Sequence, residues 1–156
     1  MRSRARSLAV SVGAAAIMSA AVIVAIVGQP STALVGTTTS RIAGADRYQT
    51  AAQIATATFS HVNTVVLASG QNFPDGLAAS GLAGADNAPV LLTPTAQLSS
   101  ASANAIAALG AHNVIIVGGA NAVSTGVQNQ LTALGYTVTR IAGSDRYATA
   151  AMVAPA

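Results

Sequence analysis

Short apolar runs separated by glycine, proline and polar residues recur along the chain from about residue 60 onward. Three runs are almost wholly apolar, at 64–68, 89–92 and 113–117, and a fourth, at 136–139, is rich in β-branched residues. A continuous apolar run that ends at turn residues is typical of a strand buried on both faces, as in a parallel sheet. We therefore predict four strands here, and we interpret residues 41–44 as the end of a further short strand that turns at a glycine.

Apolar residues between these runs fall at the spacing of a helix face. Capping or first-turn residues mark four helix starts, at Asp46, at Phe73-Pro74-Asp75, at Ser99 or Ser100, and at Ser124. The first helix should end near Thr58, and Gly110 and Gly135 should close the third and the fourth. The predicted apolar faces are, in chain order, Tyr48, Ala51, Ala52, Ile54 and Ala55; Leu77, Ala78, Gly81 and Leu82; Ala103, Ile106, Ala107 and Leu109; and Val127, Leu131 and Leu134.

Strands that alternate with helices of this length indicate βαβ units, in which crossover helices cover both faces of a mostly parallel sheet. The crossovers should be right-handed. The fold class that we predict is therefore α/β, with alternating β-α units and a mostly parallel sheet flanked by helices.

One twelve-residue stretch occurs twice in the chain. Arg41-Ile-Ala-Gly-Ala-Asp-Arg-Tyr-Gln-Thr-Ala-Ala52 returns 99 residues later as Arg140-Ile-Ala-Gly-Ser-Asp-Arg-Tyr-Ala-Thr-Ala-Ala151, and ten of the twelve positions are identical. We call these stretches the first and the second motif. A long internal repeat indicates a tandem array of similar units, so we expect one repeat at 41–139 and the start of a second, truncated repeat at 140–156.

The motifs and several further segments resemble the cell wall-binding repeat 2 family of Gram-positive surface proteins. The further segments are 67–79, 88–93, 114–119 and 122–124, and they follow one another in the order that the family has. The resemblance implies a Toprim-like α/β unit, of which three commonly assemble into one module, and non-covalent attachment to an anionic polymer of the cell wall. Gly76 departs from the family, which usually has alanine there, and this glycine weakens the start of a helix.

The first 33 residues have the organisation of a signal peptide. Three arginines within the first six residues precede an uncharged, mostly apolar stretch at 8–27, and Ser31-Thr-Ala33 offers small residues for cleavage. The alternative is an uncleaved anchor, since about twenty apolar residues also span a bilayer. We favour cleavage, with 34–40 as a linker. The rest of the chain should then be secreted to the cell wall or cell surface, without membrane contact.

The formal net charge of +3 comes from the leader. From Leu34 onward four arginines balance four aspartates, and the chain has no lysine, no glutamate and no cysteine. A surface that binds nucleic acid needs clustered basic residues, so we exclude nucleic acid as a partner. Without cysteine the chain forms no disulfide and no cysteine-ligated metal site.

The sequence shows no catalytic or metal-binding constellation. His61 and His112 precede strands, and two loop histidines do not supply the three or four ligands of a zinc site. Nucleotide-binding glycine patterns and the G-x-S-x-G elbow are absent, as are the glutamate and the Asp-x-Asp pair with which catalytic Toprim centres hold magnesium. We expect no metal, no cofactor and no enzymatic activity. Asp75 is a possible strand-end site, although stabilisation of a helix start is its favoured role.

Eight motif residues are candidates for contact with the wall polymer or with a neighbouring repeat. In the structural interpretation the aspartates cap helices, the tyrosines pack and the arginines bridge to the next repeat. In the functional interpretation the arginines bind phosphate or carboxylate groups bidentately. We favour the structural role, and the two are compatible. The eight residues are Arg41, Asp46, Arg47, Tyr48, Arg140, Asp145, Arg146 and Tyr147.

The sequence is compatible with three functions. The first is an exported, non-catalytic module that attaches to an anionic wall polymer or to peptidoglycan, with several linked repeats needed for firm retention. The alternative is the targeting fragment of a wall hydrolase of the N-acetylmuramoyl-alanine amidase type, to which family repeats are often fused. A structural component of a surface layer is the third.

Overall fold

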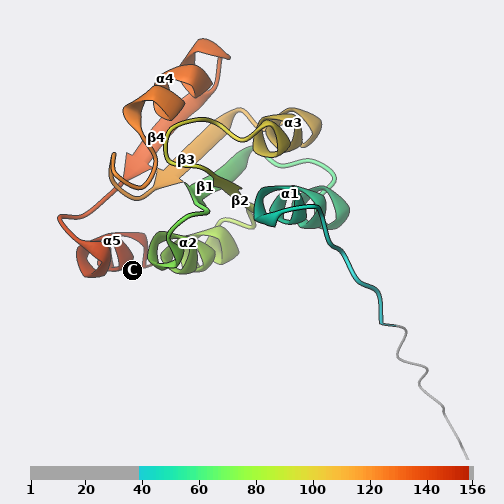
Figure 1. Cartoon of the computed structure of the whole chain (residues 1–156), viewed down its shortest axis with the longest axis horizontal. Helices are drawn as coiled ribbons and strands as arrows, with labels where there is room; N and C mark the ends of the chain where they lie inside the picture. Colours follow the sequence, from blue (N-terminus) through green and yellow to red (C-terminus); the bar gives the residue numbers. More distant parts are fainter. Residues whose placement is uncertain (1–38, 155–156) are drawn as a thin grey trace, which may run out of the picture. The chain divides into compact units, whose positions relative to one another are not determined.

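The computed structural model describes residues 39–154, so the predicted leader, its cleavage site and most of the linker lie outside the described residues. The residues from Ser40 onward form one compact unit in which helices and strands alternate (Figure 1). None of these helices is long and apolar enough to cross a membrane. The elements are α1 (Arg47–Thr58), β1 (Thr64–Ser69), α2 (Phe73–Ala85), β2 (Val90–Thr93), α3 (Ser100–Ala108), β3 (Asn113–Val117), α4 (Thr125–Ala133), β4 (Thr137–Ile141) and α5 (Arg146–Val153).

The four strands form one parallel sheet in the order β2-β1-β3-β4, which confirms the predicted α/β class. β1 lies between β2 and β3, with Val66 opposite Val90 on one side and Ile115 on the other. All four predicted strands are present, and their ends differ from the prediction by at most two residues. The largest difference is in β4, which continues through Ile141 and so into the second motif.

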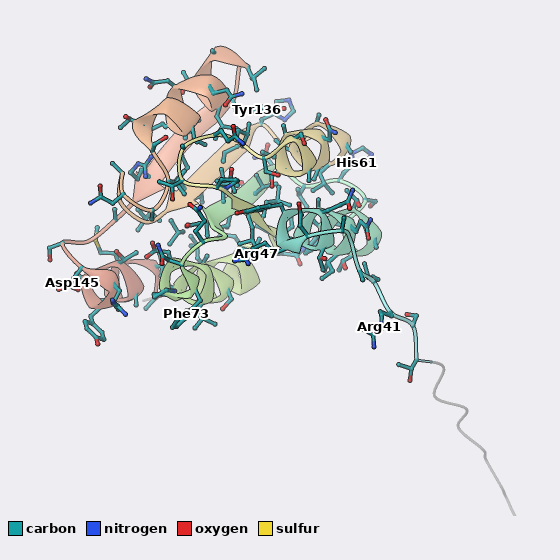
Figure 2. All side chains as sticks on the ribbon, in the orientation of Figure 1. Arg41, Arg47, His61, Phe73, Tyr136 and Asp145 are labelled. Carbon is teal, nitrogen blue, oxygen red and sulfur yellow. The ribbon has the colours of Figure 1, made fainter. Side chains whose placement is uncertain are left out.

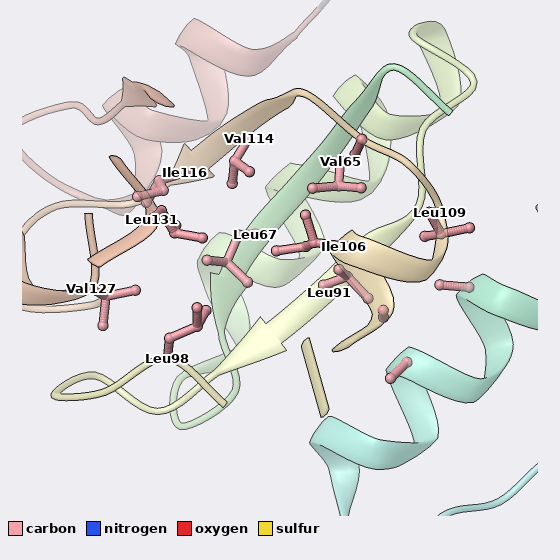
Figure 3. Close-up of a cluster of buried hydrophobic side chains, with 14 of the residues drawn as sticks. Val65, Leu67, Leu91, Leu98, Ile106, Leu109, Val114, Ile116, Val127 and Leu131 are labelled. Atoms are coloured by element: carbon pink, nitrogen blue, oxygen red, sulfur yellow. The ribbon is translucent and has the colours of Figure 1, made fainter. Parts of the chain in front are cut away.

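Side chains alternate between the two faces of the sheet and supply two apolar clusters. Val65 and Leu67 of β1 belong to the larger cluster, which α3 and α4 cover (Figure 3). Val66 and Ala68 belong to the smaller cluster, which α2 and α5 cover. α1 joins the larger cluster and packs on α3 and β2. β1 is therefore covered on both faces, as its continuous apolar run predicted.

The helices begin where the capping residues predicted. The Asp46 carboxylate accepts a 2.7 Å hydrogen bond from the N–H group of Gln49, and the Ser124 hydroxyl accepts one of 3.3 Å from the N–H group of Val127. Ser99 precedes α3 in the N-cap position, although its side chain makes no capping bond. The predicted polar residues thus mark the starts of α1, α3 and α4, and in α1 and α4 they also form the capping bond.

The buried face of α2 agrees only in part with the predicted one. Ala78 and Leu82 pack against the smaller cluster as predicted, but Ala79 and Ala83 are the most buried residues of the helix and Leu77 is 66% exposed. Helical spacing shows which residues share a face, but a helix made largely of alanine and glycine has two overlapping apolar faces. The small alanines allow close approach to the sheet. Four more residues that were expected to be buried are exposed, namely Ile54, Gly81, Ala107 and Leu134.

Residues 41–44 do not form the predicted strand end. This segment has no strand partner among the described residues, and Ile42 is 44% exposed. The same sequence pattern in the second motif does form a strand, because Arg140 and Ile141 pair with Ile116 and Val117 of β3. The prediction was wrong for the first motif because a strand requires a neighbouring strand as well as a suitable sequence.

Candidate functional site at the carboxyl ends of the strands

A pocket of about 550 Å³ lies at the carboxyl ends of β1, β3 and β4. The chain leaves β1 through α2 on one face of the sheet and leaves β3 through α4 on the other. Connections that diverge in this way open a crevice where α/β proteins commonly bind ligands. Three loops line the pocket: 72–75 after β1, 119–122 after β3, and 143–146, together with Thr149, after β4.

Gly118 makes room for the Asp75 carboxylate at the end of β3. Its φ of +110° is a backbone conformation that residues with a side chain rarely adopt. A Cβ atom at this position would also collide with the carboxylate. Glycine is therefore favoured at position 118 for both reasons, and its lack of a side chain leaves the space that the Asp75 carboxylate occupies.

Asp75 lies in the first turn of α2, where the sequence placed it. Burial raises the pKa of its carboxyl above the usual value, and the positive charge of Arg146 partly offsets this effect. Both residues line the pocket. The Asp75 carboxylate and the Arg146 guanidinium therefore meet in the pocket, although the two segments that contribute them are far apart in the sequence.

The second motif builds the wall that follows β4. Asp145 is the N-cap of α5, and its Oδ1 atom accepts hydrogen bonds from the N–H groups of Tyr147 (2.9 Å) and Ala148 (2.8 Å). A Cβ atom on Gly143 would collide with Ala148, so the turn before the helix requires glycine. Because Asp145 is engaged in capping, Arg146 supplies the charged group that the motif adds to the pocket.

Arg140, the first residue of the second motif, is half-buried and forms hydrogen bonds within the fold. Its Nη1 atom donates a 2.7 Å hydrogen bond to the carbonyl oxygen of Gly118, and its Nε atom donates one of 3.0 Å to Oε1 of Gln128. Its Nη2 atom is buried without a hydrogen-bond partner among the described residues, and burial lowers the pKa of the guanidinium. Arg140 thus joins β4 to the end of β3 and to α4.

The first motif has different surroundings (Figure 2). Nη1 of Arg47 donates a 2.6 Å hydrogen bond to the carbonyl oxygen of Gly70, and the ring of Tyr48 lies where a Cβ atom of Gly70 would be. Arg41 is exposed in the segment that precedes α1. Of the predicted site residues, the pocket brings together Asp75, Asp145 and Arg146. It does not include Arg41, Asp46, Arg47, Tyr48, Arg140 or Tyr147.

Three residues that line the pocket were not among the predicted site residues. Asn72 and Asn121 contribute amide groups, and the side chain of Phe73 is 75% exposed at the start of α2 (Figure 2). Asn72 and Phe73 also line a second hollow of about 420 Å³, which reaches Arg47 and Leu77. All three missed residues follow closely on a predicted strand end, and that position was the available signal.

The two histidines lie apart from the pocket. His61 and His112 are exposed, as predicted from their place in helix-to-strand loops. Within residues 39–154, no three side chains of His, Cys, Asp or Glu are grouped so that they could hold a metal ion.

The sequence pattern of the family described as cell wall binding domain 2 (CWB2) matches residues 41–128. The chain belongs to this family. It is therefore a cell wall-binding domain, and the resemblance noted for the first motif and the segments that follow it is confirmed.

Two relatives of this CWB2 chain are proteins of Bacillus subtilis (strain 168). N-acetylmuramoyl-L-alanine amidase LytC is 42% identical over 125 residues, which are 80% of this chain and 25% of the amidase. The amidase enhancer is 39% identical over 109 residues, which are 70% of this chain and 15% of that protein. The chain thus spans a quarter or less of either relative.

Two solved structures share the fold of the CWB2 chain. Cwp6 from Clostridium difficile matches with a TM-score of 0.68 and 32% identity, over 72% of this chain and 18% of that one. Cwp8 from the same organism matches with a TM-score of 0.68 and 29% identity, over 72% of this chain and 20% of that one. The α/β repeat is therefore a small part of these longer chains as well.

Proposed function

We propose that this CWB2 chain is a non-catalytic module that holds sugar units of an anionic wall polymer in the pocket at the carboxyl ends of β1, β3 and β4. The observation that carries the proposal is the lining of the pocket, where amide, carboxylate, aromatic and guanidinium groups meet. Export by the leader at 1–33, and secretion to the cell surface, are part of the same proposal.

The lining suits a sugar ring. The amide groups of Asn72 and Asn121 both donate and accept hydrogen bonds, and the Asp75 carboxylate accepts them from hydroxyl groups. Phe73 offers an exposed, flat apolar surface on which the carbon face of a ring can lie. The volume of about 550 Å³ falls within the range of roughly 300–1,000 Å³ that is usual for small-ligand sites. Because Phe73 also borders the second hollow, a second sugar unit fits beside the first.

Arg146 selects for a negatively charged polymer. Its guanidinium matches phosphate and carboxylate groups in a planar, bidentate geometry. One arginine per pocket gives weak attachment, so firm retention depends on several linked repeats. Arg47 and Arg140 bond to backbone carbonyl groups, so we assign them to the fold.

The pocket is better suited to binding than to hydrolysis. Cleavage of a glycosidic bond commonly uses two carboxyl groups, one of them free to take up or release a proton. Asp75 is one candidate, but the second carboxylate of the lining, Asp145, is held by two backbone N–H groups. That carboxylate is therefore already engaged in capping the start of α5.

A second candidate function is favoured by the similarity to N-acetylmuramoyl-L-alanine amidase LytC. In this version the CWB2 chain is the targeting part of a wall hydrolase, and the catalytic groups belong to another part of a longer protein. The chain matches a quarter of that amidase, which is compatible with such a division. The pocket would then concentrate the enzyme on its substrate.

The proposal is tested by sedimenting the chain with purified Gram-positive cell walls and with the same walls stripped of anionic polymers. We expect binding to intact walls, loss of binding to stripped walls, and weaker binding for Arg146→Ala, Phe73→Ala and Asp75→Asn. Arg41→Ala removes the same charge outside the pocket, and Asp86→Asn makes the same exchange at an exposed position. If these two variants lose as much binding as the pocket variants, the assignment of the pocket is wrong.

A further inference from the structure

The two motif helices pack through opposite faces. In α1 the buried residues are Ala52 and Ala55, which pack on the chain's own α3 and β2. In α5 the buried residues are Thr149 and Val153, which pack on α2 and β4. Two helices that begin with the same motif thus use two different surfaces in the same molecule.

Each face that one helix buries is more exposed on the other. Thr149 and Val153 of α5 correspond to Thr50 and Ile54 of α1, of which Thr50 is half-buried and Ile54 is 46% exposed. The reverse also holds, because the α5 equivalents of Tyr48, Ala52 and Ala55 are all exposed: Tyr147, Ala151 and Ala154. The outer face of α1 therefore resembles, in its residues, the face through which α5 packs on α2.

The segment before α1 repeats the same relationship. Ser40, Arg41 and Ile42 correspond to Thr139, Arg140 and Ile141, which form the end of β4 and pair with β3. In the first motif these residues are exposed and have no strand partner among the described residues. Arg41 is the counterpart of Arg140, which donates a hydrogen bond to the carbonyl oxygen of Gly118. Residues 40–58 therefore carry the strand end, the arginine and the helix face that dock on β3 and α2 in the second motif.

We propose that residues 40–58 of one copy of this chain dock on β3 and α2 of a second copy, in place of that copy's β4 and α5. α1 keeps its contacts with its own α3 and β2, because those use its other face. It thereby bridges two molecules head to tail. The exchange of equivalent elements needs no new type of contact, which is why swapping is an accessible route to association.

The chain's own β4 and α5 compete for the same position. They are tethered to the sheet, and a tether of this kind acts at an effective concentration on the order of 1 mM. The unmodified chain should therefore be monomeric at micromolar concentration. Loosening α5 should shift the balance toward the partner's first motif.

Sedimentation-equilibrium measurements over a range of concentrations test this. Val153→Asp places a charge in the contact between α5 and α2, and we expect its average mass to rise with concentration toward at least twice that of the monomer. Adding Ile54→Glu, at an exposed position of α1, should restore the monomer. Adding Leu134→Glu instead makes a similar exchange at a residue that is 58% exposed outside the docking face, and should leave association unchanged.

Val153→Ala covers the case in which Val153→Asp does not fold, because it removes only two methyl groups. It should associate at higher concentration than Val153→Asp and should again become monomeric with Ile54→Glu. The proposal is overturned if folded Val153→Asp and Val153→Ala both remain monomeric. It is also overturned if Ile54→Glu and Leu134→Glu affect association equally, since that result means unspecific contact through the uncovered cluster.

Discussion

Nη1 of Arg140 and the carbonyl oxygen of Gly118 are joined by a 2.7 Å hydrogen bond, which ties the second motif to the end of β3. Gly118 also lies against the Asp75 carboxylate. One glycine therefore links the first arginine of the motif to the pocket. Changes at these three residues should affect stability and binding in ways that can be told apart.

Arg140→Ala should lower the free energy of unfolding by about 1–3 kcal/mol, because it leaves the Gly118 carbonyl and the Gln128 amide without their donor. Arg140→Lys should recover only part of the loss, since an ammonium group cannot reproduce the two bonds of the guanidinium fork. Urea unfolding followed by circular dichroism measures both. The matched control is Arg41→Ala, an exposed site that should change stability by less than about 0.5 kcal/mol. Equal losses of stability for Arg140→Ala and Arg41→Ala would contradict a stabilising role for the two hydrogen bonds of Arg140.

Gly118→Ala should destabilise the chain by about 1–3 kcal/mol, because a side chain is strained at this positive φ and its Cβ atom meets Asp75. It should also weaken wall binding, because the carboxylate has to move. Gly119→Ala is the control, since the space around that position is open and should accept a methyl group. Thermal unfolding and wall sedimentation of the two variants check the prediction, and similar behaviour of both would refute it.

Asp75→Asn should become more stable relative to the unmodified chain as the pH rises. Burial raises the pKa of Asp75 in the folded state, so the folded chain binds its proton more tightly than the unfolded chain does. The contribution of this proton is full below the unfolded pKa of about 3.9 and is lost as the pH rises through the folded pKa. Unfolding free energies of both proteins between about pH 3 and pH 7 measure this difference.

A constant or decreasing difference across that range would count against the buried environment of Asp75. Arg146→Ala provides the matched test, because it removes the charge that lowers the pKa of Asp75. In the Arg146→Ala background, the loss of stability should therefore extend to higher pH.

Asp46→Ala should cost about 1 kcal/mol, because the N–H group of Gln49 loses the carboxylate that caps α1. Asp46→Asn should keep most of the stability, since the amide oxygen accepts the same bond. The midpoint of urea unfolding distinguishes the two variants. If both variants match the unmodified chain, the capping bond contributes nothing measurable.

The strands were predictable because a strand that is buried on both faces consists of consecutive apolar residues. Val65 to Ala68 are all apolar, and all are buried between two helix layers. The N-caps Asp46 and Ser124 were predictable because capping is local. The environment of Ile42 and Ile54 was not, since it depends on whether another unit lies beside the first motif. The sequence of that motif is almost the same in both copies.

The pocket was only partly predictable. Asp75 and Asn121 each follow a strand, so their position at the edge of the sheet could be inferred. That Arg146 lies beside Asp75 could not, because their proximity depends on how α5 packs on α2. Phe73 was expected only to begin a helix, and its exposure follows from the orientation of α2.

The unit that repeats in the sequence is out of phase with the unit that folds. The second copy of the motif begins at Arg140, yet Arg140 and Ile141 form the end of β4, the edge strand of the sheet. The helix that follows, α5, covers the smaller apolar cluster. A gene duplication or an expression fragment cut just before Arg140 would shorten that edge strand and uncover Val117, Ala79 and Ala83. A cut placed after α5 would preserve the sheet, the cluster and the pocket together. Boundaries for recombination in such arrays should therefore lie downstream of the motif helix.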